Sequence, residues 1–477
     1  MLLRHSLIYL LARGIPGLIN FLAIVIYTRL LEPTEYGRYA VVLASVGLVN
    51  VFLFQWLRLG VTRFLQYYSN KEKKEAFLSS ISICFAVVVM ITGFLTGIST
   101  LIFPDHKGFW ILGMFLLWAQ AWFELNLELL RSQLSPTIYG LVSLSKALLA
   151  LCLGTVFVLL GLGAIGLLLG LILGFVTSSL FIAKSLWKSV QLSLLDTRII
   201  RQLLSYGLPL TATFAMSFII NSSDRLLLSW LSGADETGQY SVIYDLSQQT
   251  LILLMTIVNL AAYPLVVRAL EHVGPEAARK QLKENAVILF SVGLPATMGL
   301  ILLTPNITNV ILGASYRESA YVIMPLIVIA AFIQGTKSFY LDLAFHLGKK
   351  TILQAWTVFI AALVNIILNL WWIPKWGSEG AAYATTCAFF IAAVASGILG
   401  RHSFPLPLPV REILKVILIT IIMILFLWPV KSYQGVNALI LQVLLGVIVS
   451  GAGLWILNVN GFRSIASSFL VHLKRKS

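Results

Sequence analysis

Long apolar runs, interrupted only by short polar breaks, continue from one end of this chain to the other. Each run is long enough to cross a bilayer as a helix, which takes about 20 apolar residues. We count fourteen such runs, and no break between them approaches the size of a soluble domain. With 59% apolar and only 11% charged residues among 477, the chain is predicted to be an all-α, polytopic membrane protein with about fourteen transmembrane helices.

Positive charge is distributed unevenly between the two sets of breaks. With the N-terminus placed inside, most of the 34 Lys and Arg residues fall in the inner loops and ends. Cytoplasmic loops of membrane proteins gather Lys and Arg in this way. The pattern predicts that both termini are cytoplasmic. It also explains the net charge of +15 as a topology signal, so nucleic acid is not expected as a partner.

Sequence motifs for cofactor or metal chemistry are absent. The three cysteines lie inside apolar runs and the six histidines are scattered, so neither set has the spacing of metal ligands. The G-x-G-x-x-G match at residues 161–166 lies between two predicted membrane helices, not after a strand. We interpret it as a turn followed by close packing of Gly166, Gly170 and Gly174. We therefore expect no cofactor, no metal and no enzymatic activity.

One polar pattern occurs twice at equivalent points of the predicted topology. LEPTEYGRY at residues 31–39 and LSGADETGQY at residues 231–240 share E-x-G-x-Y, after the first and after the seventh predicted span. Because six spans separate them, the two halves would have the same orientation and an axis along the membrane normal. We predict a six-helix lobe at residues 1–187, a second at 188–400, and two further helices with a basic tail at 401–477. A chance match is the alternative.

We interpret each copy of the pattern as a corner between two helices. Gly37 would permit a sharp reversal of the chain, and Pro33 would help to end the preceding helix. Tyr39 would anchor the next helix at the membrane interface. Glu35, Gly37 and Tyr39 are therefore not expected to contact a substrate.

Ionisable side chains at membrane depth are costly, and they usually face a cavity or pair with another charge. The three deepest are all cations, about 14 Å from the nearer helix end at the α-helical rise: Arg58, Lys146 and Lys337. They come from both predicted halves, and a cavity walled by them would suit an anionic ligand, with Arg58 forking onto phosphate oxygens. The alternative is that each cation pairs with a buried acid, for example Arg58 with Glu124.

The other intramembrane charges are shallower. Further candidates for binding an anionic substrate are Arg13 and Arg63, and those for ion coupling or pairing are Glu124, Asp245 and Asp342. Arg63, Glu128 and Asp342 lie close to a predicted cytoplasmic end, where snorkelling or a local ion pair would explain them. Glu128 and Arg131 are spaced i,i+3, which favours a pair.

Three stretches of the sequence resemble a known family. They are ARGIPGLINFLAIVIYTRLLEPTEYGRYAVV at residues 12–42, WLRLGVTRF at 56–64 and NSSDRLLLSWLSGADETGQYSVIYDLS at 221–247. They resemble the Wzx-type polysaccharide-repeat flippases, which translocate O-antigen and exopolysaccharide units. That family belongs to the multidrug/oligosaccharidyl-lipid/polysaccharide exporter superfamily, together with the MATE drug exporters and the lipid II flippase.

The resemblance implies a two-lobed helical transporter that works by alternating access. It would move an undecaprenyl-pyrophosphate-linked oligosaccharide to the outer leaflet of a bacterial inner membrane, for O-antigen, capsule or exopolysaccharide synthesis. The pyrophosphate would meet Arg58, Lys146 and Lys337, while the lipid tail would stay in the bilayer. Expected partners are this substrate, membrane lipids, and the polysaccharide polymerase and chain-length machinery.

Two other functions stay open at this point. An ion-coupled drug or cation antiporter of the same superfamily would need buried carboxylates, whereas the deepest charges here are positive. A membrane glycan polymerase or ligase usually carries a large extracytoplasmic catalytic loop, and the sequence has none.

Overall fold

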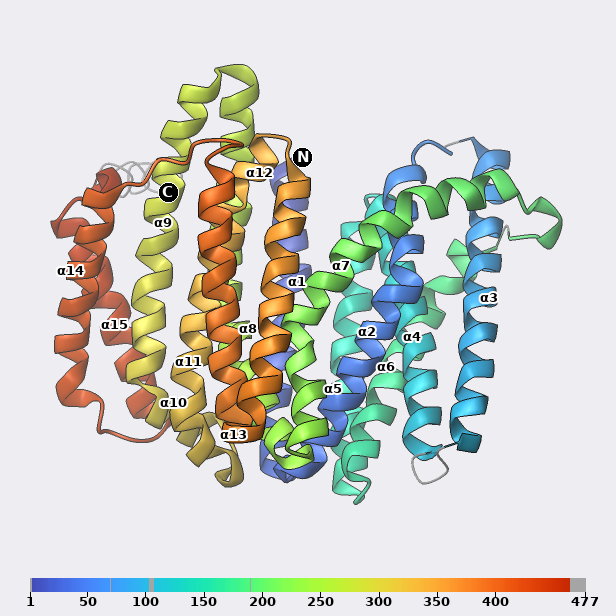
Figure 1. Cartoon of the computed structure of the whole chain (residues 1–477), viewed down its shortest axis with the longest axis horizontal. Coiled ribbons are helices and arrows are strands. Elements are labelled where there is room, and N and C mark those ends of the chain that lie inside the picture. Colours follow the sequence, from blue (N-terminus) through green and yellow to red (C-terminus); the bar gives the residue numbers. More distant parts are fainter. Residues whose placement is uncertain (1, 69, 103–106, 189, 464–477) are drawn as a thin grey trace, which may run out of the picture. The chain divides into compact units, whose positions relative to one another are not determined.

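The computed structural model describes residues 2–68, 70–102, 107–188 and 190–463, and within them the chain forms helices and turns but no β-strand (Figure 1). The long helices of the first half are α1 Leu2–Leu30, α2 Pro33–Phe64, α3 Lys71–Ile102, α4 Lys107–Ser132, α5 Pro136–Leu159, α6 Gly163–Leu186 and α7 Thr197–Leu231. The helices that follow are α8 Ala234–His272, α9 Pro275–Leu302, α10 Thr304–Ile311, α11 Arg317–Thr336, α12 Leu343–Leu347, α13 Thr351–Gly400, α14 Val410–Leu427 and α15 Val436–Ile456.

The predicted all-α membrane architecture is confirmed. In the described ranges, twelve helices are long and apolar enough to cross a membrane. One of them, α13, would extend for about 75 Å at the α-helical rise, more than twice the ~30 Å hydrocarbon core. It is broken at Gly377, whose φ of 51° is left-handed, and its two limbs run antiparallel (Figure 1). Counting both limbs and adding α1 gives the fourteen crossings that the sequence predicts.

The chain divides into two compact units between Gly238 and Gln239. In the first unit, α2 packs against α4 and α7, while α5 packs against α1 and α6. In the second unit, α11 packs against α9 and α13, while α14 packs against α9 and α15. The unit boundary thus follows α7, whereas the predicted lobe boundary precedes it. The three predicted segments are defined by the repeated pattern, and they stay a prediction.

The close packing predicted after the G-x-G-x-x-G match is confirmed. A Cβ atom added to Gly170 would lie 2.5 Å from the backbone nitrogen of Gly154, and one added to Gly174 would lie 3.1 Å from that of Ala150. Helices α5 and α6 therefore approach each other with only small side chains between them, as small-residue stripes permit in membrane proteins.

The chain does turn at the start of each stretch, but the E-x-G-x-Y residues follow the turn, so the interpretation of Gly37 as the residue that permits the reversal is wrong. The chain reverses at Leu31 and Glu32, and Pro33 begins α2 instead of ending α1. Proline suits the first helical positions because its missing N–H would have no partner there. Gly37 lies inside α2 and does not make the reversal. Glu35 Oε2 accepts a hydrogen bond of 2.8 Å from the backbone N–H of Ala164, which caps the start of α6.

The two copies of the pattern instead contact each other. A Cβ atom added to Gly37 would lie 1.8 Å from the backbone oxygen of Ala234, and one added to Gly238 would lie 1.9 Å from that of Pro33. Real side chains do not come this close to backbone, so both positions require glycine. We call this contact between the first turns of α2 and α8, formed by Pro33, Gly37, Ala234 and Gly238, the glycine crossing.

The contacts at the glycine crossing are reciprocal. Pro33 and Ala234 occupy equivalent places in the two copies, as do Gly37 and Gly238. Gly37 of the first copy approaches Ala234 of the second, and Gly238 of the second copy approaches Pro33 of the first. A third equivalent pair adds a hydrogen bond, in which Thr34 Oγ1 donates to Asp235 Oδ1 at 3.3 Å. Reciprocal contacts of this kind are what a two-fold relation between two segments produces.

Candidate functional site

A group of charged and polar side chains lies between α2 and α4 in the first unit. Arg58 on α2 forms an ion pair with Glu124 on α4, through Nη1 and Oε2, and their side chains are 13% and 29% exposed. Asn50 Nδ2 donates to Glu124 Oε2 at 2.9 Å, and Gln120 Nε2 donates to Glu124 Oε1 at 2.9 Å. The alternative in which Arg58 pairs with Glu124 is therefore the arrangement that the structure shows.

A second carboxylate lies one helical turn further along α4. Glu128 Oε1 accepts a hydrogen bond from the Thr62 hydroxyl and forms an ion pair of 2.8 Å with Arg131 Nη2. The predicted i,i+3 pair of Glu128 and Arg131 is confirmed. Within α2, Thr62 Oγ1 also contacts the backbone oxygen of Arg58 at 3.1 Å. The contacts of Arg58 with Glu124 and of Thr62 with Glu128 join α2 and α4 over two consecutive turns.

Both ion pairs line a cavity of about 280 Å³, which also has aromatic walls from Tyr139 and Phe214. Beside it, Arg58 Nε and Asn50 Oδ1 are buried without a hydrogen-bond partner among the described residues. Buried polar atoms in proteins are nearly always hydrogen-bonded. An unsatisfied donor and an unsatisfied acceptor therefore make this a place that can bind a polar ligand. We call it the Arg58 cavity.

The structure does not bring Lys146 to the Arg58 cavity. Lys146 lies on α5, and its Nζ is 4.6 Å from the centre of the Phe175 ring on α6. This cation–π contact stabilises a partly buried ammonium that has no acidic partner in the described part of the chain. Lys146 does not line the cavity that contains Arg58 and Glu124.

Lys337 belongs to the second unit, where it is buried with Asp342. Lys337 Nζ lies 2.7 Å from Asp342 Oδ2, and the two residues are only 5% and 3% exposed. Asp342 also accepts hydrogen bonds from Gln354 Nε2 at 3.3 Å and from the Ser396 hydroxyl at 2.8 Å. Lys337 opens a π-helical segment, Lys337–Leu341, that places it beside Asp342. Such segments are rare and are often found at functional sites.

Breaking this buried pair is expected to lower stability strongly. Replacing Lys337 by methionine leaves the Asp342 charge without its cation, which typically costs about 3–5 kcal/mol. The double variant Lys337→Met with Asp342→Asn should recover most of that loss. Thermal unfolding of the purified protein, followed by size-exclusion chromatography, measures both. Lys415→Met, which breaks the more exposed pair with Glu412, is the matched control and should cost about 1 kcal/mol or less. An equal loss of thermal stability in Lys415→Met and Lys337→Met would contradict the expectation that the buried pair contributes more to stability than the exposed one.

Three predicted site residues remain. Arg13 lies on α1, where its side chain falls outside the described residues. Arg63 lies on α2 with an exposed side chain, and Asp245 lies on α8 in the second unit, half-buried. Among the residues that the structure describes, no group of three or more His, Cys, Asp or Glu side chains could hold a metal ion.

Sequence reasoning missed the neutral side chains that hold the carboxylates in place: Asn50, Thr62 and Gln120. Spacing could have found two of them. Gln120 precedes Glu124 by four residues and Thr62 follows Arg58 by four, so each pair shares a helix face. Asn50 carries a weaker signal, since it is a lone amide in an apolar run.

Comparison with known proteins places this chain among membrane proteins of related fold. A family model described as polysaccharide biosynthesis protein matches residues 2–270. The uncharacterized membrane protein MJ1068 of Methanocaldococcus jannaschii is 24% identical over 275 residues, which are 56% of this chain and 52% of that protein. The chain thus matches about half the length of this curated relative.

Two solved structures are similar over most of the chain. The lipid II flippase MurJ, in an inward closed conformation, has a TM-score of 0.77 at 17% identity, over 95% of this chain and 99% of that one. An inward-facing multidrug resistance MATE family transporter of the MOP superfamily has a TM-score of 0.63 at 15% identity, over 83% and 97%. At such identities the likeness concerns the fold.

Proposed function

Because the chain belongs to the polysaccharide biosynthesis protein family, we propose that it flips undecaprenyl-pyrophosphate-linked oligosaccharide repeat units across the bacterial cytoplasmic membrane. The units would serve O-antigen, capsule or exopolysaccharide synthesis. Both termini would be cytoplasmic, and the polymerase and chain-length machinery would receive the units on the outer side. The protein would work by alternating access and would carry out no covalent chemistry on the glycan.

The observation that carries this proposal is the Nε–H group of Arg58, which is buried beside the Arg58 cavity without a hydrogen-bond partner among the described residues. A guanidinium presents several N–H groups in a planar fork, which matches the oxygens of a phosphate. Glu124 is also held by Asn50 and Gln120, so it keeps two hydrogen bonds if Arg58 turns toward a ligand. If Arg58 leaves the Glu124 carboxylate for a pyrophosphate, these two amide donors still hydrogen-bond the carboxylate, and this supports reversible binding.

Other charged residues have secondary roles in the proposed function. Lys146, Arg13 and Arg63 remain predicted contacts for the anionic substrate. Lys337 would reach a phosphate only after separating from Asp342, its partner at 2.7 Å. For ion coupling, Glu124, Asp245 and Asp342 remain candidates.

One observation favours a second function. Two carboxylates, Glu124 and Glu128, line the Arg58 cavity, and a cation antiporter would need such groups. Both already pair with an arginine, however, which leaves little net negative charge for a cationic substrate.

Gene deletion followed by lipid extraction separates the two functions. Loss of a flippase should make single lipid-linked repeat units accumulate on the cytoplasmic side, while surface polysaccharide disappears. Normal surface polysaccharide together with an altered tolerance to cationic drugs would instead support the antiporter. The control is the same deletion complemented with the intact gene, which should restore the parental lipid profile.

A further inference from the structure

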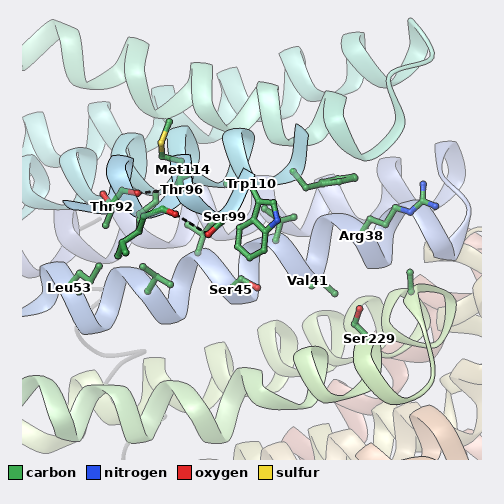
Figure 2. Close-up of a pocket in the computed structure, with 18 residues that line it drawn as sticks. Arg38, Val41, Ser45, Leu53, Thr92, Thr96, Ser99, Trp110, Met114 and Ser229 are labelled. Carbon is green, nitrogen blue, oxygen red and sulfur yellow. Dashed lines mark hydrogen bonds between the residues drawn. The ribbon is translucent and has the colours of Figure 1, made fainter. Parts of the chain in front are cut away.

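A second and larger cavity of the first unit is an elongated apolar groove between α2, α3 and α4, and its lining also includes Ser229 of α7 and Ala234 of α8. Its volume is about 560 Å³. Figure 2 shows Arg38 at one end of the groove and Leu53 at the other, with Ser45 and Trp110 between them. The stretch of α2 from Arg38 to Leu53 is about 22 Å long at the α-helical rise. The groove is therefore long and narrow, which suits an extended chain better than a compact head group.

The hydroxyl groups of α3 in the groove wall already have partners. Thr92 Oγ1 donates to the backbone oxygen of Val88 at 2.9 Å and accepts from Trp118 Nε1 at 2.9 Å. Thr96 and Ser99 each donate to the backbone oxygen four residues earlier, at 2.9 and 3.0 Å. Hydroxyls bound in this way offer little to a polar ligand, so this wall presents mainly methyl and methylene groups. A hydrocarbon occupant fits this lining.

The groove is aligned with the Arg58 cavity along α4. Trp110, Gly113 and Leu117 line the groove, while Glu124 and Glu128 line the Arg58 cavity. Successive positions are separated by three, four, seven and four residues, which are the spacings that place side chains on one face of an α-helix. An amphiphile with its charged head in the Arg58 cavity would therefore have an apolar groove ahead of it on the same helix.

We propose that this groove binds the polyprenyl chain of the lipid-linked substrate while the pyrophosphate is in the Arg58 cavity. The inference rests on the proposed function and changes one expectation, because the lipid tail would no longer stay wholly in the bilayer. In the predicted orientation, the groove lies in the outer half of the membrane and the head enters from the cytoplasmic side. A lipid in that position keeps the orientation it has in the inner leaflet.

Length favours a polyprenyl chain over a phospholipid. From Arg58 at mid-depth to Arg38 near its outer end, α2 extends along its own axis for about 30 Å at the α-helical rise, a length equal to the thickness of the hydrocarbon core. A phospholipid chain occupies one leaflet, about half that thickness. Only a longer chain follows the groove to its far end from a head in the Arg58 cavity.

Photocrosslinking tests the occupant directly. The full protein carries benzoylphenylalanine at Val49, in the groove wall, and is reconstituted in phosphatidylglycerol–phosphatidylethanolamine vesicles with radiolabelled undecaprenyl diphosphate. The matched control carries it at Phe181, an exposed position on α6 outside the groove. We expect at least fivefold more labelled product at Val49 than at Phe181, reduced by unlabelled undecaprenyl diphosphate but not by added phosphatidylglycerol. Equal capture at both positions, or competition by phosphatidylglycerol, overturns the proposal in favour of a phospholipid.

Filling the groove tests its use in transport. A Cβ atom on Gly113 would meet Val46 and Val42 at ordinary distances of 3.8 and 3.9 Å, so Gly113→Leu occupies the groove without a backbone clash. We expect Gly113→Leu to slow flipping in vesicles about tenfold. It should also abolish the crosslink at Val49 that unlabelled undecaprenyl diphosphate reduces. Gly97→Leu on α3, where nothing lies within 4 Å, should leave both unchanged.

The results separate failure of the inference from failure of the proposed function. If the wild-type protein flips lipid-linked units and Gly113→Leu flips them equally fast, the groove assignment is wrong but the proposed flippase function stands. Failure of the wild-type protein to flip lipid-linked units in vesicles overturns both.

Discussion

Replacing Arg58 by alanine is expected to reduce export of lipid-linked repeat units by about tenfold to a hundredfold, since a hydrogen bond to a charged group contributes about 1.5–3 kcal/mol. Arg58 lines the cavity and its Nε–H group has no hydrogen-bond partner among the described residues. The substitution removes the guanidinium N–H groups that would bind a pyrophosphate. Export is measured as surface polysaccharide and as accumulated lipid-linked units, in cells matched for the amount of protein in the membrane.

A double variant separates binding from folding. Arg58→Ala alone leaves the Glu124 carboxylate without its cation, and a buried charge without a partner destabilises the fold. Arg58→Ala combined with Glu124→Gln removes both charges, so we expect thermal stability to recover while export stays low. Wild-type export by the double variant would show that Arg58 serves only as the partner of Glu124.

A matched arginine controls for the substitution itself. Arg279 also pairs with a glutamate, Glu276, at 2.7 Å, but Glu276 is 85% exposed. Exposed pairs of this kind contribute little to stability. Arg279 also lies 5.9 Å from the centre of the Phe404 ring, so Arg279→Ala should leave export at the wild-type level and lower the free energy of unfolding by about 1 kcal/mol at most.

Much of the fold could be predicted because the membrane restricts what a chain can do. Every backbone polar group must be satisfied within a helix, so apolar runs of sufficient length directly indicate the spans. The break at Gly377 was visible for the same reason, since the polar stretch IPKWGSEG interrupts a run that is long enough for two crossings. The unit boundary after Gly238 was not visible, because it depends on which helices pack together and not on their hydropathy.

The candidate site could be predicted only in part. Depth along a helix singled out Arg58 and Lys337, because the cost of a charge depends on its distance from water. Depth does not identify partners. Glu124 meets Arg58 because α4 packs against α2, and nothing local in either helix encodes that contact. Lys146 was placed with the other cations for the same lack of partner information, and the structure places it against Phe175.

The glycine pattern shows how a local interpretation can be wrong about a long-range contact. Near a proline and a glutamate, Gly37 looked like a turn residue, because glycine is common in turns. Its actual constraint comes from Ala234, far away in the sequence. Only the second occurrence of the pattern hinted at this, and a repeat does not by itself indicate that its copies touch.

Replacing Gly37 by alanine is expected to open the glycine crossing. The added Cβ would lie 1.8 Å from the backbone oxygen of Ala234, so two helix backbones must move apart, at a cost of about 1–3 kcal/mol or more. Cysteines at Thr34 and Asp235 report the change, because these side chains are hydrogen-bonded at 3.3 Å. With the three native cysteines replaced, we expect at least a fivefold lower disulfide yield in Gly37→Ala. Gly17→Ala on α1, where nothing lies within 4 Å, should not alter the yield. An unchanged yield in Gly37→Ala would contradict the close approach.

The same cysteine pair distinguishes a fixed contact from one that must open during transport. Under the proposed alternating access, the starts of α2 and α8 lie on the outer side and have to separate when the glycan leaves. Oxidising Thr34→Cys with Asp235→Cys should then stop export almost completely, and reductant should restore it. Either single cysteine variant is the control, since it loses the hydrogen bond but cannot be locked. If the oxidised pair exports at the rate of the reduced one, the glycine crossing is a permanent joint of the first unit, and the opening on the outer side must form elsewhere.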